Sequence, residues 1–280
     1  MQKLARAKKE NEALDGWSSS ISEELRLADV WEEPTRGRCK MTTADHHDWI
    51  TFHRVQFAQP VSATERSFPP VPGAKLSRLG PQSTIGADGL PWPESQFWGG
   101  FSIWASRAEA EAMIADPVTA MPWLRETTAA WHCLAVPFAH RGEVNLRGTV
   151  ESGTAIRPAA TDPGGPLAII TSAGFNVVSA ETMPRIMNFL VGVLEVVDWY
   201  RTLPSNLRAS AFAGRYEGRD GITFTLWKSD EAMQQAAYHP GHHRARIDDD
   251  RAGLLTDRTS FTRLRVLKSH GDWDGDPFLA

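Results

Sequence analysis

The sequence contains little cysteine and no long hydrophobic run. Its 280 residues include only two cysteines, Cys39 and Cys133, which lie far apart and form no CxxC pattern. Two such residues are too few for the disulfide framework of a small secreted protein, and Cys133 is expected to be a small buried residue. The longest apolar stretch, residues 186–194, is well short of the roughly 20 residues that span a bilayer. We therefore expect no membrane span.

An apolar run behind the basic residues near the N-terminus is also missing. No secretory signal is visible without such a run, so a cytoplasmic location is the default expectation. The chain has no excess of positive charge either, since its formal net charge is -4 and the two signs are interspersed. Proteins that bind nucleic acid usually carry a basic patch, so nucleic acid is not an expected partner.

Several common catalytic motifs are absent. No GxSxG, P-loop or GxGxxG motif follows a strand-like segment in the required context. The sequence therefore gives no support to a serine hydrolase, an NTPase or a Rossmann domain. What it does contain is 41% hydrophobic and 23% charged residues, which is typical of a globular protein.

Composition and pattern divide the chain into four parts. Residues 1–40 form a charged arm, and Met41 begins a more ordinary globular pattern, so the arm could be an upstream extension of the reading frame. The remaining parts are a first repeat (41–147), a linker rich in glycine, proline and threonine (148–165) and a second repeat (166–280).

The two repeats are indicated by an internal duplication. Aligning Trp104 with Trp227 also aligns Ser106 with Ser229, and each serine is a plausible N-cap between a strand-like and a helix-like segment. The second repeat predicts strands over 167–172, 208–215, 222–227 and 260–267, with helices over 180–203 and 230–249. The first repeat predicts strands over 50–57, 101–104 and 132–138 and a helix over 107–114, with long loops before Phe101, including one from Gly80 to Pro93.

The order of elements in the second repeat is β-α-β-β-α-β, which is the ferredoxin-like arrangement. Two open antiparallel sheets of this kind each expose an apolar face, and joining them as a barrel removes that surface from water. The predicted fold is therefore α+β, with two tandem ferredoxin-like repeats forming a barrel.

Three of the nine histidines, His239, His242 and His243, crowd into one short segment, and Arg244 and Arg246 follow. Imidazole is the commonest side-chain ligand for transition metals, and the arginines could pair with acidic groups of a cofactor. The alternative interpretation is an exposed, hydrophilic start of a helix.

Helical geometry ranks the histidines. Pro240 disfavours helical geometry at His239, so a helix that restarts after it would hold His242 and His243 in its first turn. His243 lies four residues before Ile247 and shares its face, which the apolar side chain suggests is turned inward. His243 is the first choice as a metal ligand, His242 the second and His239 the third. A mononuclear non-haem site that uses the aspartates at 248–250 stays open, although no HExxH or facial-triad spacing occurs.

The second repeat resembles the spheroidene monooxygenase family of carotenoid biosynthesis. The similarity covers most of residues 166–276 and, more weakly, 49–140; its most specific parts are 221–227, 238–247 and the closing Gly-Asp-Trp-Asp-Gly of 271–275. The family's histidine, five residues after an aromatic, corresponds to His243. The N-terminal arm, His239, His242 and the loop from Gly80 to Pro93 depart from the family pattern.

The resemblance implies a haem-containing monooxygenase on a dimeric α+β barrel scaffold. In that case His243 would be the axial ligand of haem b, with Arg244 or Arg246 at a propionate and an apolar or small organic substrate. Dioxygen and an electron donor would be partners, and a homo-oligomer is possible. His53, His132 and His140 are candidate distal groups, but each is more readily a strand residue with a local hydrogen bond. Haem-dependent dehydration or isomerisation, and haem binding without catalysis, remain alternatives.

Overall fold

The computed structural model describes residues 47–62, 68–142, 144, 155–213, 220–238 and 256–274. The chain divides into two units, residues 1–44 and 45–280, and every described residue belongs to the second unit. The predicted arm therefore lies outside the described residues, as does part of the predicted linker.

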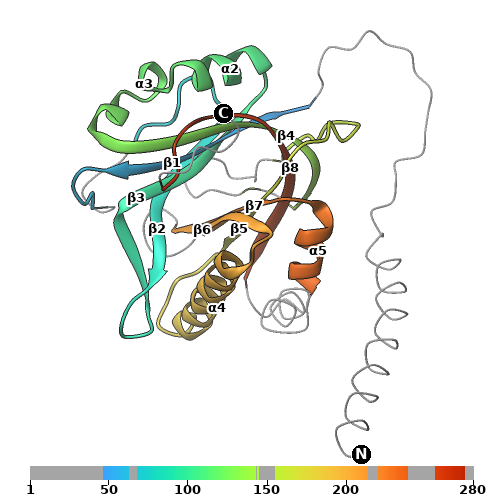
Figure 1. Ribbon diagram of the computed structural model, residues 1–280. Coiled ribbons are helices and arrows are strands. Elements are labelled where there is room, and N and C mark those ends of the chain that lie inside the picture. The colour runs from blue at the N-terminus through green and yellow to red at the C-terminus, as the bar shows by residue number, and fades with distance from the viewer. Residues whose placement is uncertain are drawn as a thin grey trace, which may run out of the picture. The chain divides into compact units, whose positions relative to one another are not determined.

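Eight antiparallel strands of the described region close into a barrel in the order β1-β3-β2-β6-β7-β5-β8-β4 (Figure 1). Each half has the ferredoxin-like strand order, β4-β1-β3-β2 in the first and β8-β5-β7-β6 in the second, and the halves join at the β2–β6 and β4–β8 pairs. The predicted α+β fold with two ferredoxin-like repeats is confirmed. The strands are β1 (Trp49–Phe57), β2 (Leu76–Ile85), β3 (Pro91–Trp104), β4 (Thr127–Gly142), β5 (Leu167–Gly174), β6 (Asn206–Ala213), β7 (Asp220–Trp227) and β8 (Arg258–Gly271).

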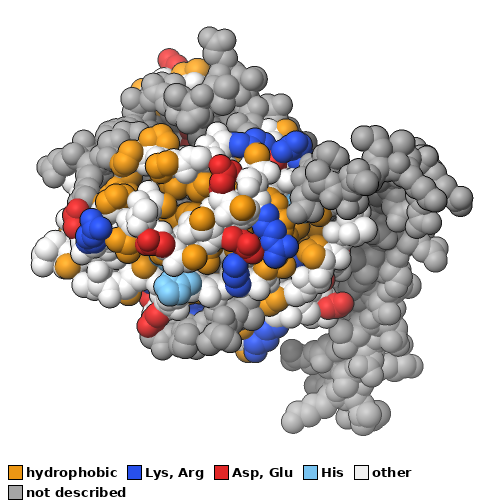
Figure 2. Space-filling view, turned by 90° about the horizontal axis from the view of Figure 1, so that it is seen from above, with side chains coloured by type: hydrophobic (Ala, Val, Ile, Leu, Met, Phe, Trp, Pro, Cys, Tyr) orange, Lys and Arg blue, Asp and Glu red, His pale blue; other side chains and the backbone are white. Residues whose placement is uncertain are grey.

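Helices cover the barrel on two opposite sides (Figure 1). The first half carries α2 (Arg107–Ala115), α3 (Pro117–Ala120) and the 3-10 helix η1 (Pro122–Glu126); the second carries α4 (Met183–Thr202) and α5 (Asp230–Tyr238). Both predicted serine caps are present. The Ser106 hydroxyl accepts a hydrogen bond from the Glu109 amide, and the Ser229 hydroxyl accepts one from the Ala232 amide. On the side of α2 and α3, charged side chains of both signs are scattered among hydrophobic ones (Figure 2).

The expected loop from Gly80 to Pro93 is wrong. These residues belong to β2 and β3, which pair from Leu76 with Ile103 out to Ile85 with Pro91 around a short turn. Glycine and proline are frequent in loops, and their density suggested one here. However, the part of β3 before Phe97 pairs only with β2, and prolines are tolerated in a strand that has a free edge.

The interior of the barrel is filled by aromatic side chains. Phe52 of β1 stacks on Phe224 of β7, with ring centroids 3.8 Å apart, and Trp131 of β4 lies 5.3 Å from Trp273. Cys133 faces the same interior and is fully buried, as expected, and burial raises the pKa of its thiol to about 12. A buried thiol of this kind is unreactive, so Cys133 has a packing role. Among the described helices, none is long and apolar enough to cross a membrane.

Candidate functional site

The predicted ligand and cofactor residues lie outside the described residues. His242, His243, Arg244 and Arg246 all belong to the segment 239–255, as do His239 and the three aspartates of the alternative metal site. Their roles therefore stay predictions. In the part of the chain that the structure describes, no three histidine, cysteine, aspartate or glutamate side chains are grouped so that they could hold a metal ion.

Part of the outer face of the second half is accessible in the described structure. Side chains of a strand alternate between the two faces of a sheet. In β5, the inward Ala168, Ile170 and Ser172 are buried, whereas the outward Ile169, Thr171 and Ala173 are half-exposed. In β7, the outward Gly221 and Thr223 are half-exposed in the same way.

These five outward positions form one continuous patch. Thr171 pairs with Thr223 and Ala173 pairs with Gly221, while Ile169 lies two residues before Thr171 on the same face. We call Ile169, Thr171, Ala173, Gly221 and Thr223 the open floor. Its side chains are small or medium in size and none is charged. It can therefore support a flat, largely apolar group without the cost of burying a charge.

Two helices close one end of the open floor. Tyr200 of α4 makes an edge-on ring contact with Trp227 of β7, with centroids 4.8 Å apart. Met233 and Ala236 of α5 pack in the same cluster. Beneath α4, the outward residues of β6 are Ala209 and Ala211, and such small side chains let a helix approach a sheet closely.

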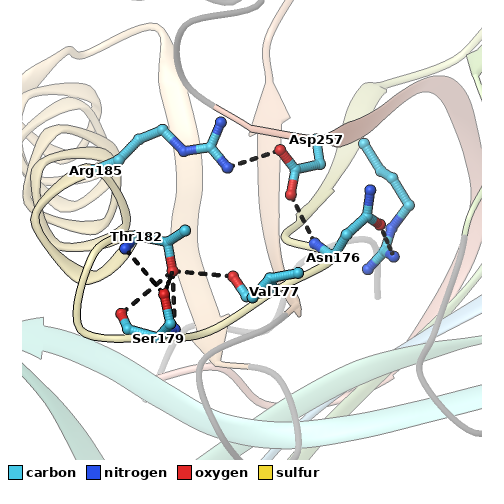
Figure 3. A network of polar contacts seen from close by, with 7 residues as sticks. Asn176, Val177, Ser179, Thr182, Arg185 and Asp257 are labelled. Atoms are coloured by element: carbon cyan, nitrogen blue, oxygen red, sulfur yellow. Dashed lines mark hydrogen bonds and ion pairs between the residues drawn. The ribbon is translucent and has the colours of Figure 1, made fainter.

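A polar network lies at the other end of this half and fixes the start of β8 to the loop between β5 and α4 (Figure 3). Asp257 accepts hydrogen bonds from the Asn176 amide at 2.7 Å and from the Arg185 guanidinium at 2.7 Å. Burial acts to raise the pKa of Asp257, but these two donors outweigh it and hold the pKa below its usual value. The neighbouring Arg258 donates to the Asn176 side chain and pairs with Asp220.

The two ends of the histidine segment are therefore attached to one half of the molecule. The segment follows α5, which packs on β7 through Met233 and Ala236, and it leads into Asp257, which is tied to the β5–α4 loop. The half that carries both attachments is the half that has the open floor.

His53 and His132 lie on the outer face of the first half. Their Nδ1 atoms are 2.9 Å apart, and His53 Nε2 is 3.1 Å from the hydroxyl of Thr51, which accepts a hydrogen bond from the Trp104 indole. Each histidine is only 2% exposed. Burial lowers the pKa of His132 to about 3 and holds the pKa of His53 well below its usual 6.5, so both rings are neutral.

His140, the third candidate distal group, places Nδ1 2.9 Å from the Thr262 hydroxyl. All three histidines thus make the local hydrogen bonds that the strand interpretation expects.

The open floor was missed at the sequence level. A signal for it existed in the outward positions of the second half, where alanine, threonine and glycine recur at alternate residues of β5 and β7. The corresponding positions of the first half include tryptophan, histidine and valine. The sequence duplication hid this difference, because it was recognised from the strand ends and the helix caps.

Known proteins resemble this chain only distantly. No family model matches the chain, and no curated protein matches it. Among solved structures, an aldoxime dehydratase is 15% identical over 81% of this chain and 83% of its own, with a TM-score of 0.46. A provisionally assigned monooxygenase of Fusobacterium nucleatum is 8% identical over 82% of this chain and 96% of its own, with a TM-score of 0.35. An anthrone oxidase-like protein is 12% identical over 83% of this chain and 96% of its own, with a TM-score of 0.28. At these scores, the likenesses carry no argument about activity.

Proposed function

We propose that this chain is a haem-dependent monooxygenase that acts on an apolar or small organic substrate, as the resemblance to the spheroidene monooxygenase family implies. The observation that carries the proposal is the position of the open floor. It lies in the half of the barrel to which both ends of the histidine segment are attached. A cofactor held by that segment would have an uncharged sheet surface to lie against.

The described residues fit such a group in size and polarity. Haem is flat and apolar except at its propionates, and the open floor offers small aliphatic side chains and two threonine hydroxyls. The nearby Arg185 and Arg258 are already paired with Asp257 and Asp220. A propionate would therefore need other cations, and Arg244 or Arg246 is the predicted partner.

Haem b, once bound, would supply the oxygen chemistry, and the protein would set its axial ligand, its surroundings and the access of substrate. His243 is the proposed ligand, and His242 is its nearest rival. The open floor would exclude water from one side of the site and favour an apolar substrate. Dioxygen and an external electron donor complete the proposed reaction, in the cytoplasm.

The first experiment is a haem titration of the purified protein, followed by absorption spectroscopy. We expect the Soret band of free haem to shift and sharpen on addition to the wild type, with saturation at one equivalent. His243→Ala should leave the band as it is in free haem, and the matched His242→Ala variant should give the wild-type shift. An unshifted band in the wild type would overturn the proposal, and a wild-type shift in His243→Ala would show that another residue is the ligand.

Isotope labelling then separates the reaction types. With labelled dioxygen, a monooxygenase incorporates the label into its product. A haem-dependent dehydratase or isomerase yields an unlabelled product. Haem binding without turnover of any substrate under any oxidant would indicate a haem-binding protein instead.

A further inference from the structure

A second feature of this chain, separate from the open floor, is the aromatic cluster around Trp273 inside the barrel. Trp273 follows β8, and its indole packs into the barrel interior, where it is only 3% exposed. Its ring is stacked with those of Phe52 and Phe224, with centroids at 6.2 and 6.0 Å, and it meets Trp131 edge-on. The indole is thus enclosed by aromatic rings from β1, β4 and β7.

Positive charge faces the same indole. The guanidinium of Arg54 lies 5.1 Å from the Trp273 ring centroid and that of Arg208 lies 6.0 Å from it. Arg54 is almost fully buried, and its Nη1 pairs at 2.8 Å with the carboxylate of Asp274, which is largely exposed. Buried arginine beside an aromatic ring combines cation–π attraction with recognition of a carboxylate.

Trp273 and Asp274 reach this position through an unusual backbone path. Gly271 has a φ of 88°, and a Cβ there would lie 2.0 Å from the Ala130 carbonyl oxygen. Asp274 itself has a φ of 58°, which costs free energy for a residue with a side chain. Gly271, two residues before Trp273, and Asp274, directly after it, therefore both adopt the left-handed region. The ion pair with Arg54 stabilises this position of Asp274.

We propose that this end of the barrel is a binding site for an aromatic carboxylate, and that Trp273 and Asp274 of the chain occupy it as an internal competitor. The aromatic part of the ligand would replace the indole among Phe52, Phe224 and Trp131. Its carboxylate would replace that of Asp274 on Arg54. The mouth of a β-barrel is a common place for such sites, in which a few polar groups orient an apolar ligand.

The exchange keeps the aromatic packing, because a ligand of the same shape restores the contacts that the indole gives up. Asp274 leaves an exposed position, whereas Arg54 stays buried and keeps a carboxylate partner throughout. The relaxation of the left-handed backbone at Asp274 favours release. The concentration of ligand then decides which occupant is bound.

Calorimetry with indole-3-acetate as the probe tests the proposal, with neutral indole as the matched ligand. We expect weak, saturable binding of indole-3-acetate to the full-length wild-type protein, together with faster amide hydrogen exchange over residues 271–274. Asp274→Asn should bind the probe several-fold more tightly, because the internal competitor loses its charge. Trp273→Ala should bind it at least tenfold more tightly. The exposed Glu195→Gln should behave as the wild type.

Arg54 is examined in the Trp273→Ala background. Arg54→Met should weaken indole-3-acetate binding at least tenfold and leave the binding of indole unchanged. Binding by Trp273→Ala but not by the wild type would show a space created only by the substitution, and would overturn the proposal. So would equal affinities for the two ligands. If Trp273→Ala does not fold, the change of affinity in Asp274→Asn decides.

Discussion

The outer faces of the two halves have the same strand pairing but differ in how far their side chains are exposed. Trp49 pairs with Trp104 in the first half as Leu167 pairs with Trp227 in the second, so His53 corresponds to Thr171 and Val55 to Ala173. The two residues of the first half are at most 2% exposed, whereas their counterparts are half-exposed. Duplication thus preserved the sheet, while one face became part of the core and the other kept accessible surface.

The helices explain this difference. In the first half, α2 and η1 place Met113 and Trp123 over large outward side chains such as Trp98 and Phe57, and the space between helix and sheet is filled. In the second half, α4 packs over the alanines of β6 and leaves part of β5 and β7 uncovered. An outward residue is therefore a packing residue in one half and a candidate binding residue in the other.

The largest effect is expected at Gly100, the counterpart of Thr223. A Cβ at Gly100 would lie 1.7 Å from the Arg78 carbonyl oxygen, so Gly100→Ala forces two paired backbones apart. We expect a loss of ~3 kcal/mol or more in the free energy of unfolding. Thr223→Ala on the open floor should cost less than ~1 kcal/mol. Urea denaturation measures both, and equal losses would contradict the close approach of the β2 and β3 backbones at Gly100.

Truncation of an aliphatic side chain should also lower the free energy of unfolding more in the first half than in the second, but by a smaller difference. Leu134 of the first half is fully buried, so Leu134→Ala should lower the free energy of unfolding by ~3 kcal/mol through lost transfer energy and a cavity. Ile169→Ala removes a half-exposed side chain and should cost about 1 kcal/mol. A similar cost for both variants in urea denaturation would contradict an uncovered second face.

The buried histidine pair predicts a pH dependence that belongs to the first half alone. The folded pKa of His132 is about 3, far below its unfolded value of 6.5, so the unfolded chain binds a proton that the folded chain does not. Stability is complete above pH 6.5 and falls as the pH drops toward 3, by up to about 1.4 kcal/mol per pH unit for each such histidine. His132→Asn should flatten this slope between pH 6 and about 4 in denaturation experiments. An unchanged slope in His132→Asn would count against burial of the neutral ring.

Enlargement of the open floor is expected to have the smallest effect on stability. Thr171→Phe adds bulk at a half-exposed position and should change the free energy of unfolding by less than ~1 kcal/mol. If the floor supports haem, the same variant should weaken haem binding at least tenfold in a Soret titration. His53→Phe in the first half would instead break the His53–His132 contact and should destabilise the fold without altering haem affinity. Normal haem affinity in Thr171→Phe would show that the haem does not lie against the open floor.

Much of the architecture could be predicted from the residues. Alternation identified β1, the serine caps identified the starts of α2 and α5, and Trp104 with Trp227 disclosed the duplication. The β2–β3 hairpin could not be identified, because its prolines and glycines are tolerated only through the free edge that the finished sheet provides. The ranking of His243 above His242 rests on helical facing and on family resemblance, and remains a prediction.

The sequence by itself determined which residues alternate, where the helices begin and that one unit was duplicated, because these properties depend on neighbours along the chain. Only the tertiary structure decided which outward residues became core and which stayed accessible, and that Trp273 lies inside the barrel. Coverage of a sheet face depends on helices contributed from elsewhere in the chain and on the volumes they leave unfilled. The same strand pattern can therefore produce a filled layer at His53 and an open floor at Thr171.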